Sequence, residues 1–98
     1  MEIVRTESGD EVTLKISGCL DTAATPQFAA EMEKAATAGA IVLDMSSLEF
    51  ISSSALRQLV AVQKRRGSGL RIVLVGMNEV VREVFSVTGL DEVFEVRV

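Results

Sequence analysis

Two short, uninterrupted apolar runs, at residues 41–43 and 72–75, flank a segment whose apolar residues recur at helical spacing. Unbroken apolar runs are typical of parallel strands that are covered on both faces. The segment between them is predicted to be a helix by its apolar positions, which are Ala55, Leu56, Leu59, Val60 and Val62. Because strands joined by a crossover helix lie parallel to each other, we expect a sheet that is at least partly parallel.

An antiparallel hairpin is expected ahead of this unit. Residues 3–6 and 12–17 have strand character, and the turn formers of residues 8–10 lie between them. In the second strand every other residue is apolar, namely Val12, Leu14 and Ile16. Gly18 is expected to end this strand.

Two further helices have recognisable starts and stops. Thr25 is expected to be the N-cap of a helix with Pro26 at its first position, and Gly39 is expected to stop it. The apolar face of this helix consists of Phe28, Met32, Ala35 and Ala36. Asn78 is expected to cap a last helix that ends at Gly89. The apolar residues of this helix are Val80, Val81, Val84 and Phe85.

Alternating strands and helices predict the α/β class. We expect one domain over residues 1–98, with a mixed sheet of four to five strands and three to four helices. Residues 93–98 alternate again and are interpreted as a final strand or a tail.

The charge balance and the residue counts disfavour several classes of function. Lys and Arg total 10 and Asp and Glu total 14, so the net charge is −4, which argues against a dedicated nucleic-acid binder. The chain has no His, which removes Ser-His and Cys-His nucleophile pairs and a common metal ligand. We therefore expect no catalytic site and no metal. The lack of a signal peptide or a spanning segment predicts a cytoplasmic protein.

Three local features are interpreted as structural. The glycines of Gly67-Ser68-Gly69 fit a helix stop and a turn, because no phosphate-loop pattern surrounds them. The cations at residues 64–66 complement the dipole of a helix C-terminus. Cys19, the only cysteine, is expected to be a small residue packed at a strand end, and it permits no internal disulfide.

Two aspartates follow apolar stretches at expected strand ends, where partners often meet an open sheet. Asp44 is interpreted as ending a strand and anchoring the next turn. For Asp21, a structural role and a functional role both stay open.

Three consecutive serines, residues 52–54, lead directly into the central helix. A helix cap requires one hydroxyl, so two serines remain unexplained. A phosphoryl group on one of them would face the helix N-terminus, where backbone N–H groups and the helix dipole favour negative charge. Phosphorylation at this position is therefore one interpretation of the triplet, and a simple cap is the other.

The order and spacing of five segments resemble the STAS domain, the module shared by sulphate transporters and bacterial anti-sigma factor antagonists. The segments are residues 18–21 (Gly-Cys-Leu-Asp), 41–46 (Ile-Val-Leu-Asp-Met-Ser), 50–56 (Phe-Ile-Ser-Ser-Ser-Ala-Leu), 74–76 (Leu-Val-Gly) and 88–90 (Thr-Gly-Leu). The resemblance covers nearly the whole chain, and the short length resembles the stand-alone antagonists. It implies a STAS-like mixed sheet over residues 1–98.

The resemblance also implies a mechanism. The unphosphorylated domain would bind an anti-sigma factor that is also a serine kinase, and phosphorylation of the motif serine would release that partner. The motif serine corresponds to Ser53, with Ser52 and Ser54 as alternatives. The implied contact surface consists of Asp21, Thr22, Ser52, Ser53, Ser54, Ala55 and Leu56. ATP would belong to the kinase, so no cofactor is assigned to this chain.

Two residues differ from the family pattern, because Ser52 stands where the family has Asp and Ala55 where it has Gly. Ala55 is expected to add a methyl group where a partner backbone approaches. These differences motivate a second hypothesis, in which the domain is a constitutive adaptor of a transport ATPase complex and is not phosphorylated. A third hypothesis, a small enzyme or nucleotide-binding protein, is disfavoured by the lack of histidine and of a phosphate loop.

Overall fold

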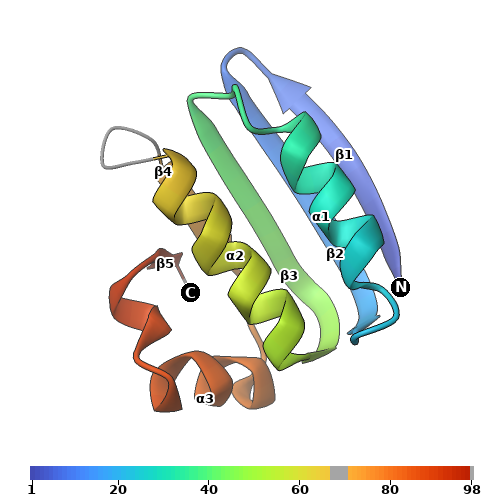
Figure 1. The fold of residues 1–98 in the computed structure, drawn as a ribbon, viewed down its shortest axis with the longest axis vertical. Coiled ribbons are helices and arrows are strands. Elements are labelled where there is room, and N and C mark those ends of the chain that lie inside the picture. Colours follow the sequence, from blue (N-terminus) through green and yellow to red (C-terminus); the bar gives the residue numbers. More distant parts are fainter. Residues whose placement is uncertain (67–70, 98) are drawn as a thin grey trace.

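A five-stranded sheet carries two long helices on one face and a third helix towards one end (Figure 1). The computed structural model describes residues 1–66 and 71–97. The elements in chain order are β1 (Glu2–Ser8), β2 (Glu11–Leu20), α1 (Thr25–Lys34), β3 (Ala40–Ile51), α2 (Ser53–Arg66), β4 (Arg71–Val75), α3 (Glu79–Val87), a 3₁₀ turn η1 (Leu90–Glu92) and β5 (Glu95–Arg97).

The strands lie in the order β1-β2-β3-β4-β5. β1 and β2 form an antiparallel hairpin, and each of the remaining neighbours is parallel. The hairpin turn passes through Gly9, whose φ of +59° favours glycine. The α/β class, the mixed sheet and the antiparallel N-terminal hairpin are therefore confirmed. The final segment contains a short strand, β5.

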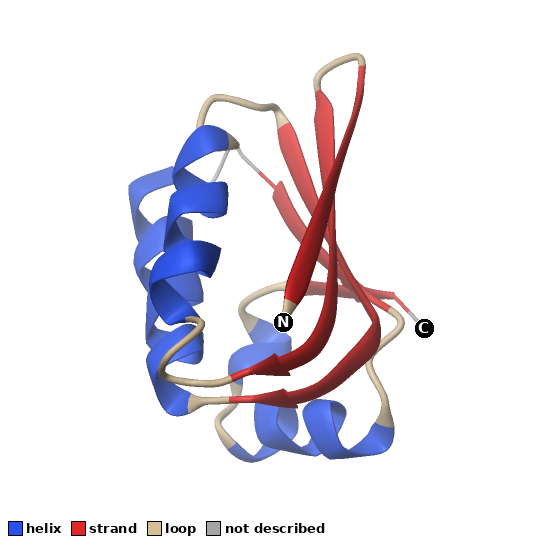
Figure 2. Ribbon diagram, turned by 90° about the vertical axis from the view of Figure 1, so that its right-hand side faces the viewer, coloured by secondary structure: helices blue, strands red, loops and turns tan. Residues whose placement is uncertain are grey.

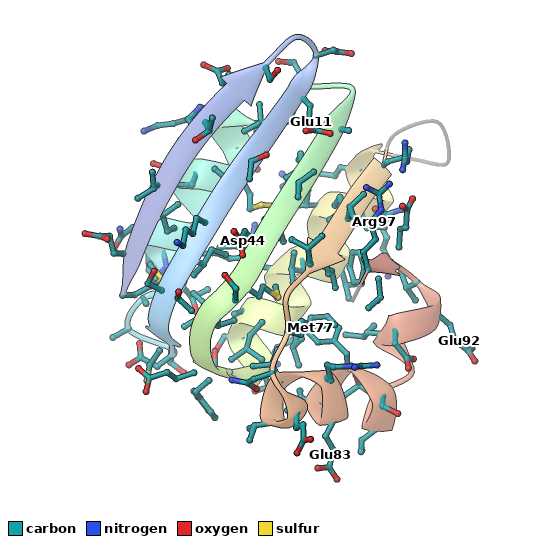
Figure 3. The ribbon with its side chains drawn as sticks, turned by 180° about the vertical axis from the view of Figure 1, so that it is seen from behind. Glu11, Asp44, Met77, Glu83, Glu92 and Arg97 are labelled. Atoms are coloured by element: carbon teal, nitrogen blue, oxygen red, sulfur yellow. The ribbon has the colours of Figure 1, made fainter. Side chains whose placement is uncertain are left out.

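The core lies between the sheet and the helices, and Figure 2 shows α1 and α2 together on one side of the sheet. The alternation predicted for β2 is confirmed, because Val12, Leu14 and Ile16 are buried. Each helix contributes large side chains to the core, among them Phe28 and Met32 of α1, Leu59 and Val62 of α2, and Val81 and Phe85 of α3. This packing covers one sheet face and leaves the opposite face without a helix in the described part of the chain (Figure 3).

β2 does not end at Gly18, as the sequence predicted, but continues to Leu20. Gly18 has a φ of +86°, and the pairing with β3 shifts register immediately after it. The strand thus passes through an irregularity, which glycine tolerates, and then resumes pairing. Cys19 lies in this resumed part, next to the strand end as expected, but it is exposed, so the expectation that it is packed there was wrong.

β3 is longer than the apolar run that predicted it, because β2 continues beside it as far as Ile51. Asp44 consequently lies within β3 and not at its end, although the pairing with β4 stops there. Its carboxylate accepts hydrogen bonds from the Ser46 backbone N–H at 3.0 Å and from the Ser46 hydroxyl at 2.7 Å. These bonds lower the pKa of Asp44. Asp44 therefore anchors the backbone locally, within a continuing strand.

The boundaries of α1 also differ from the prediction. The helix starts at Thr25 with Ala24 as its N-cap, and the Thr25 hydroxyl donates to the Asp21 carbonyl at 3.0 Å, so Thr25 does not cap it. Pro26 is the second residue of the helix, one position later than predicted, and still lies in the first turn. The helix ends at Lys34, before Gly39, whose backbone N–H donates to the Asp10 carbonyl at 2.9 Å.

The predicted cap of α3 is confirmed, since the Asn78 side chain accepts from the Val81 N–H at 2.8 Å. Gly89 follows the C-cap with a φ of +75°, as a helix-ending glycine does. In the basic cluster, Arg65 forms an ion pair with Glu33 of α1 at 2.6 Å. The predicted stop and turn at residues 67–69 lies outside the described residues.

Candidate functional site

The loop after β2 and the turn after β3 lie together at one edge of the sheet. The two strands are parallel and end at the same level, where Leu20 pairs with Ile51. The Ser52 N–H donates to the Leu20 carbonyl at 2.8 Å, which joins the two connections. The sheet topology therefore brings the Asp21 loop next to the serine triplet at the carboxyl ends of two strands, a common place for binding in open sheets.

Ser52 is the serine that caps α2. Its side chain is buried, with 8% exposed, and its Oγ accepts a hydrogen bond from the Ala55 N–H at 3.3 Å. The Ser52 carbonyl accepts the first helical bond, from the Leu56 N–H at 3.1 Å. The structural reading of the triplet therefore applies to Ser52, and this hydroxyl is engaged within the fold.

Ser53 and Ser54 occupy the first turn of α2 in different environments. Ser54 is half-buried, and its Oγ lies 3.2 Å from the Thr22 hydroxyl, which joins α2 to the loop after β2. Ser53 is exposed, and its side chain makes no hydrogen bond with another described residue. Of the three hydroxyls, that of Ser53 is therefore the one most open to modification.

Asp21 shapes the loop beside these serines. One carboxylate oxygen accepts from the Ala24 N–H at 2.9 Å, and the Asp21 carbonyl accepts from the Thr25 N–H at 3.1 Å. Asp21 is thus a turn-forming residue whose side chain is also exposed. Asp21 thus has the structural role that the sequence left open. Because its side chain is exposed, Asp21 can also contact a partner.

Ala55 and Leu56 point inward, with exposures of 0% and 7%. The methyl group that distinguishes Ala55 from the family glycine therefore packs in the core and adds nothing to the outer surface. Of the expected contact residues, the exposed or half-exposed ones are Asp21, Thr22, Ser53 and Ser54. A partner that docks here meets these four side chains directly.

A groove of about 580 Å³ continues from Ser53 along α2. We call it the α2 groove, and it is lined by Ser53, Leu56, Arg57, Val60, Ala61, Lys64, Thr88 and Leu90. Sequence reasoning missed Arg57, although its position four residues after Ser53 places the two on one helix face. It also missed Thr88 and Leu90 as site residues, because only the tertiary structure brings the end of α3 to α2.

The described residues contain no group of three or more His, Cys, Asp or Glu side chains placed to hold a metal ion. In the same part of the chain, no helix is long and apolar enough to cross a membrane. The arrangement around Ser53 consists of hydroxyls, a carboxylate and an adjoining groove, which are features suited to binding.

The chain matches a known protein family and a curated protein. Residues 3–96 match the family model described as "Mlab, STAS domain". BtrV of Bordetella bronchiseptica, which is described as an anti-sigma factor antagonist, is 36% identical over 85 residues, covering 83% of this chain and 72% of BtrV.

Solved structures share the fold. An anti-sigma factor antagonist from Mycobacterium paratuberculosis superposes with a TM-score of 0.88 at 24% identity, covering 97% of this chain and 83% of that one. The phosphorylated form of the Bacillus cell fate determinant SpoIIAA superposes with a TM-score of 0.76 at 20% identity, covering 99% and 92%. SpoIIAA has also been solved unphosphorylated, with a TM-score of 0.70, 19% identity and coverage of 94% and 97%.

Proposed function

Because the chain belongs to the STAS domain family and to its anti-sigma factor antagonists, we propose that it binds an anti-sigma factor that is also a serine kinase. We further propose that phosphorylation of Ser53 releases this partner. The domain then acts as a regulatory binding protein and not as an enzyme, and the ATP-using partner places it in the cytoplasm.

The observation that carries this proposal is the difference among the three serines. Ser52 is buried and caps α2, and Ser54 lies against Thr22, whereas Ser53 is exposed without a hydrogen-bonding partner among the described residues. A kinase can therefore reach the Ser53 hydroxyl while the cap stays intact. The resemblance to the family likewise assigns the motif serine to Ser53.

The physical effect of a phosphate at Ser53 fits a switch. At the N-terminus of α2 the added charge, about −1.5 to −2, faces backbone N–H groups and the positive end of the helix dipole, so the fold tolerates it. On a surface that a partner covers, the same charge has to be desolvated and repels acidic groups of the partner, which disfavours binding. SpoIIAA, which has the same fold, has been solved both unphosphorylated and phosphorylated. In that protein the fold therefore accepts a phosphate, which supports the proposal for this chain.

A second candidate function is a constitutive adaptor of a transport ATPase complex. It is favoured by Ser52, which supplies a capping hydroxyl where the family has a carboxylate beside the phosphoacceptor. In that case the same exposed residues around Ser53 would contact a transporter subunit permanently, and ATP would have no effect on binding.

A pull-down from a lysate of the source organism separates the two candidates. The baits are the wild type and Ser53→Asp, each used with and without ATP, and mass spectrometry identifies both the captured proteins and any phosphate on the bait. We expect the wild type to capture a kinase-like anti-sigma factor, Ser53→Asp to lose it, and ATP to yield phosphate on Ser53. Capture of one transporter subunit by both baits, with no modified serine, would replace the first proposal with the second.

A further inference from the structure

The α2 groove has a charge that is opposite to that of the chain as a whole. The protein carries a net charge of −4, yet among the described residues that line the groove the charged ones are two cations, Arg57 and Lys64. Both are exposed, and neither forms an ion pair or a hydrogen bond with another described residue. Two cations that have no carboxylate partner in the described part of an acidic protein favour an acidic ligand.

Between these cations the groove is apolar. Leu56, Val60 and Ala61 of α2 form one side, and Leu90 comes from the turn after α3. Val87, next in sequence to the lining residue Thr88, is 79% exposed. Side chains of this type, flanked by charges, resemble the grooves in which proteins bind amphipathic helices.

The spacing of the cations limits the shape of the ligand. Arg57 and Lys64 are seven residues apart, so they lie on one face of α2, about 10 Å apart along its axis. A partner helix that lies along the groove matches this spacing when its acidic residues are also two turns apart and its apolar residues lie between them.

From this geometry we infer that the α2 groove docks an acidic, amphipathic helix of the partner protein. The inference deepens the proposed function and rests on it for the identity of the partner. It also adds a role for Arg57, which lies one helical turn after Ser53 and faces the same groove. Phosphate on Ser53 pairs with Arg57 and brings the charge of the described groove lining from +2 to about zero. The acidic helix then loses the cations that attract it.

The groove is tested directly with a synthetic peptide, which needs no native partner. The probe is a helix-stapled amphipathic peptide of about 15 residues with Leu side chains on one face and two Glu seven residues apart. The matched control peptide has Lys in place of both Glu. Binding to the isotope-labelled full chain is followed by NMR chemical shifts of backbone amides and by calorimetry.

We expect the Glu peptide to shift the amides of groove residues and to bind about tenfold more tightly than the Lys peptide. Arg57→Glu should reverse this preference, while Lys15→Glu, on the sheet face opposite the helices, should leave it unchanged. In Arg57→Gln, the further change Ser53→Asp should weaken binding of the Glu peptide less than it does in the wild type. Melting temperatures of each variant confirm that the fold is retained.

Equal binding of the two peptides, shifts located on the opposite sheet face, or no binding of either peptide would overturn the inference. The pull-down separates this failure from failure of the proposed function. If the wild type captures the kinase and both Arg57→Glu and Lys64→Glu capture it equally well, the groove inference is wrong and the proposed function stands. If the Glu peptide binds as described but no kinase is captured, the groove stands and the proposed function fails.

Discussion

Replacing each serine of the triplet by alanine should have three different effects on stability. Ser52→Ala removes the side-chain oxygen that accepts from the Ala55 N–H at 3.3 Å, at a buried helix start. Loss of an N-cap costs about 1 kcal/mol. For a domain of 98 residues this corresponds to a fall in melting temperature of about 4–8 °C.

The other two serines provide matched comparisons within the same segment. Ser54→Ala removes one exposed hydrogen bond, to Thr22, and should cost about 0.5 kcal/mol. Ser53→Ala removes no side-chain hydrogen bond of the described structure and should change the free energy of unfolding by less than about 0.5 kcal/mol.

Thermal unfolding followed by circular dichroism and urea unfolding at equilibrium measure all three variants. The order of destabilisation should be Ser52→Ala, then Ser54→Ala, then Ser53→Ala. If Ser53→Ala is as destabilised as Ser52→Ala, Ser53 is the structural serine and the assignment of roles in the triplet is wrong.

Three further predictions concern the fold that positions the site. Phe85→Ala, at a fully buried position, should cost about 3–5 kcal/mol in urea unfolding, whereas Phe50→Ala, at a side chain 46% exposed, should cost much less; similar losses would refute the packing. Gly76→Ala and Gly89→Ala introduce the same backbone strain, because the two glycines have φ of +74° and +75°. Of the two, only Gly76 has an atom within 3 Å of the added methyl group, so Gly76→Ala should have the lower melting temperature. Equal melting temperatures would contradict this prediction. Asp44 has a lowered pKa because of its two hydrogen bonds, so the stability it contributes is present above its ordinary pKa and is lost as the pH falls through the lowered value. The urea midpoints at about pH 7 and about pH 2 should therefore differ more in the wild type than in Asp44→Asn. If this difference is the same in both proteins, Asp44 does not contribute to the pH dependence of stability.

The sequence predicted the order and type of most strands and helices, because strand and helix periodicity are local signals. The alternation in β2 and the cap at Asn78 were predicted correctly on this basis. The ends of β2 and β3 were not, because they extend by pairing with each other beyond the irregularity after Gly18. That pairing is a tertiary effect, and Gly18 by itself indicated a strand end.

The candidate site was predictable in its location but not in its detail. The serine triplet identified the start of α2, yet a difference of one residue in the helix start decides which serine is the cap. The exposure of Cys19 depends on which face of β2 it occupies after the register shift. The α2 groove depends on Leu90, which lies 33 positions after Arg57 in the sequence and reaches α2 only in the folded chain.

The most direct test of the proposed function is a calorimetric titration of the purified anti-sigma factor kinase into the wild type and into Ser53→Asp. If Ser53 is the switch, the wild type should bind with an affinity at least about tenfold higher than Ser53→Asp, while Ser54→Asp should have a smaller effect. Equal affinities for the wild type and Ser53→Asp would contradict the account, because a charge at the exposed start of α2 would then have no influence on the partner.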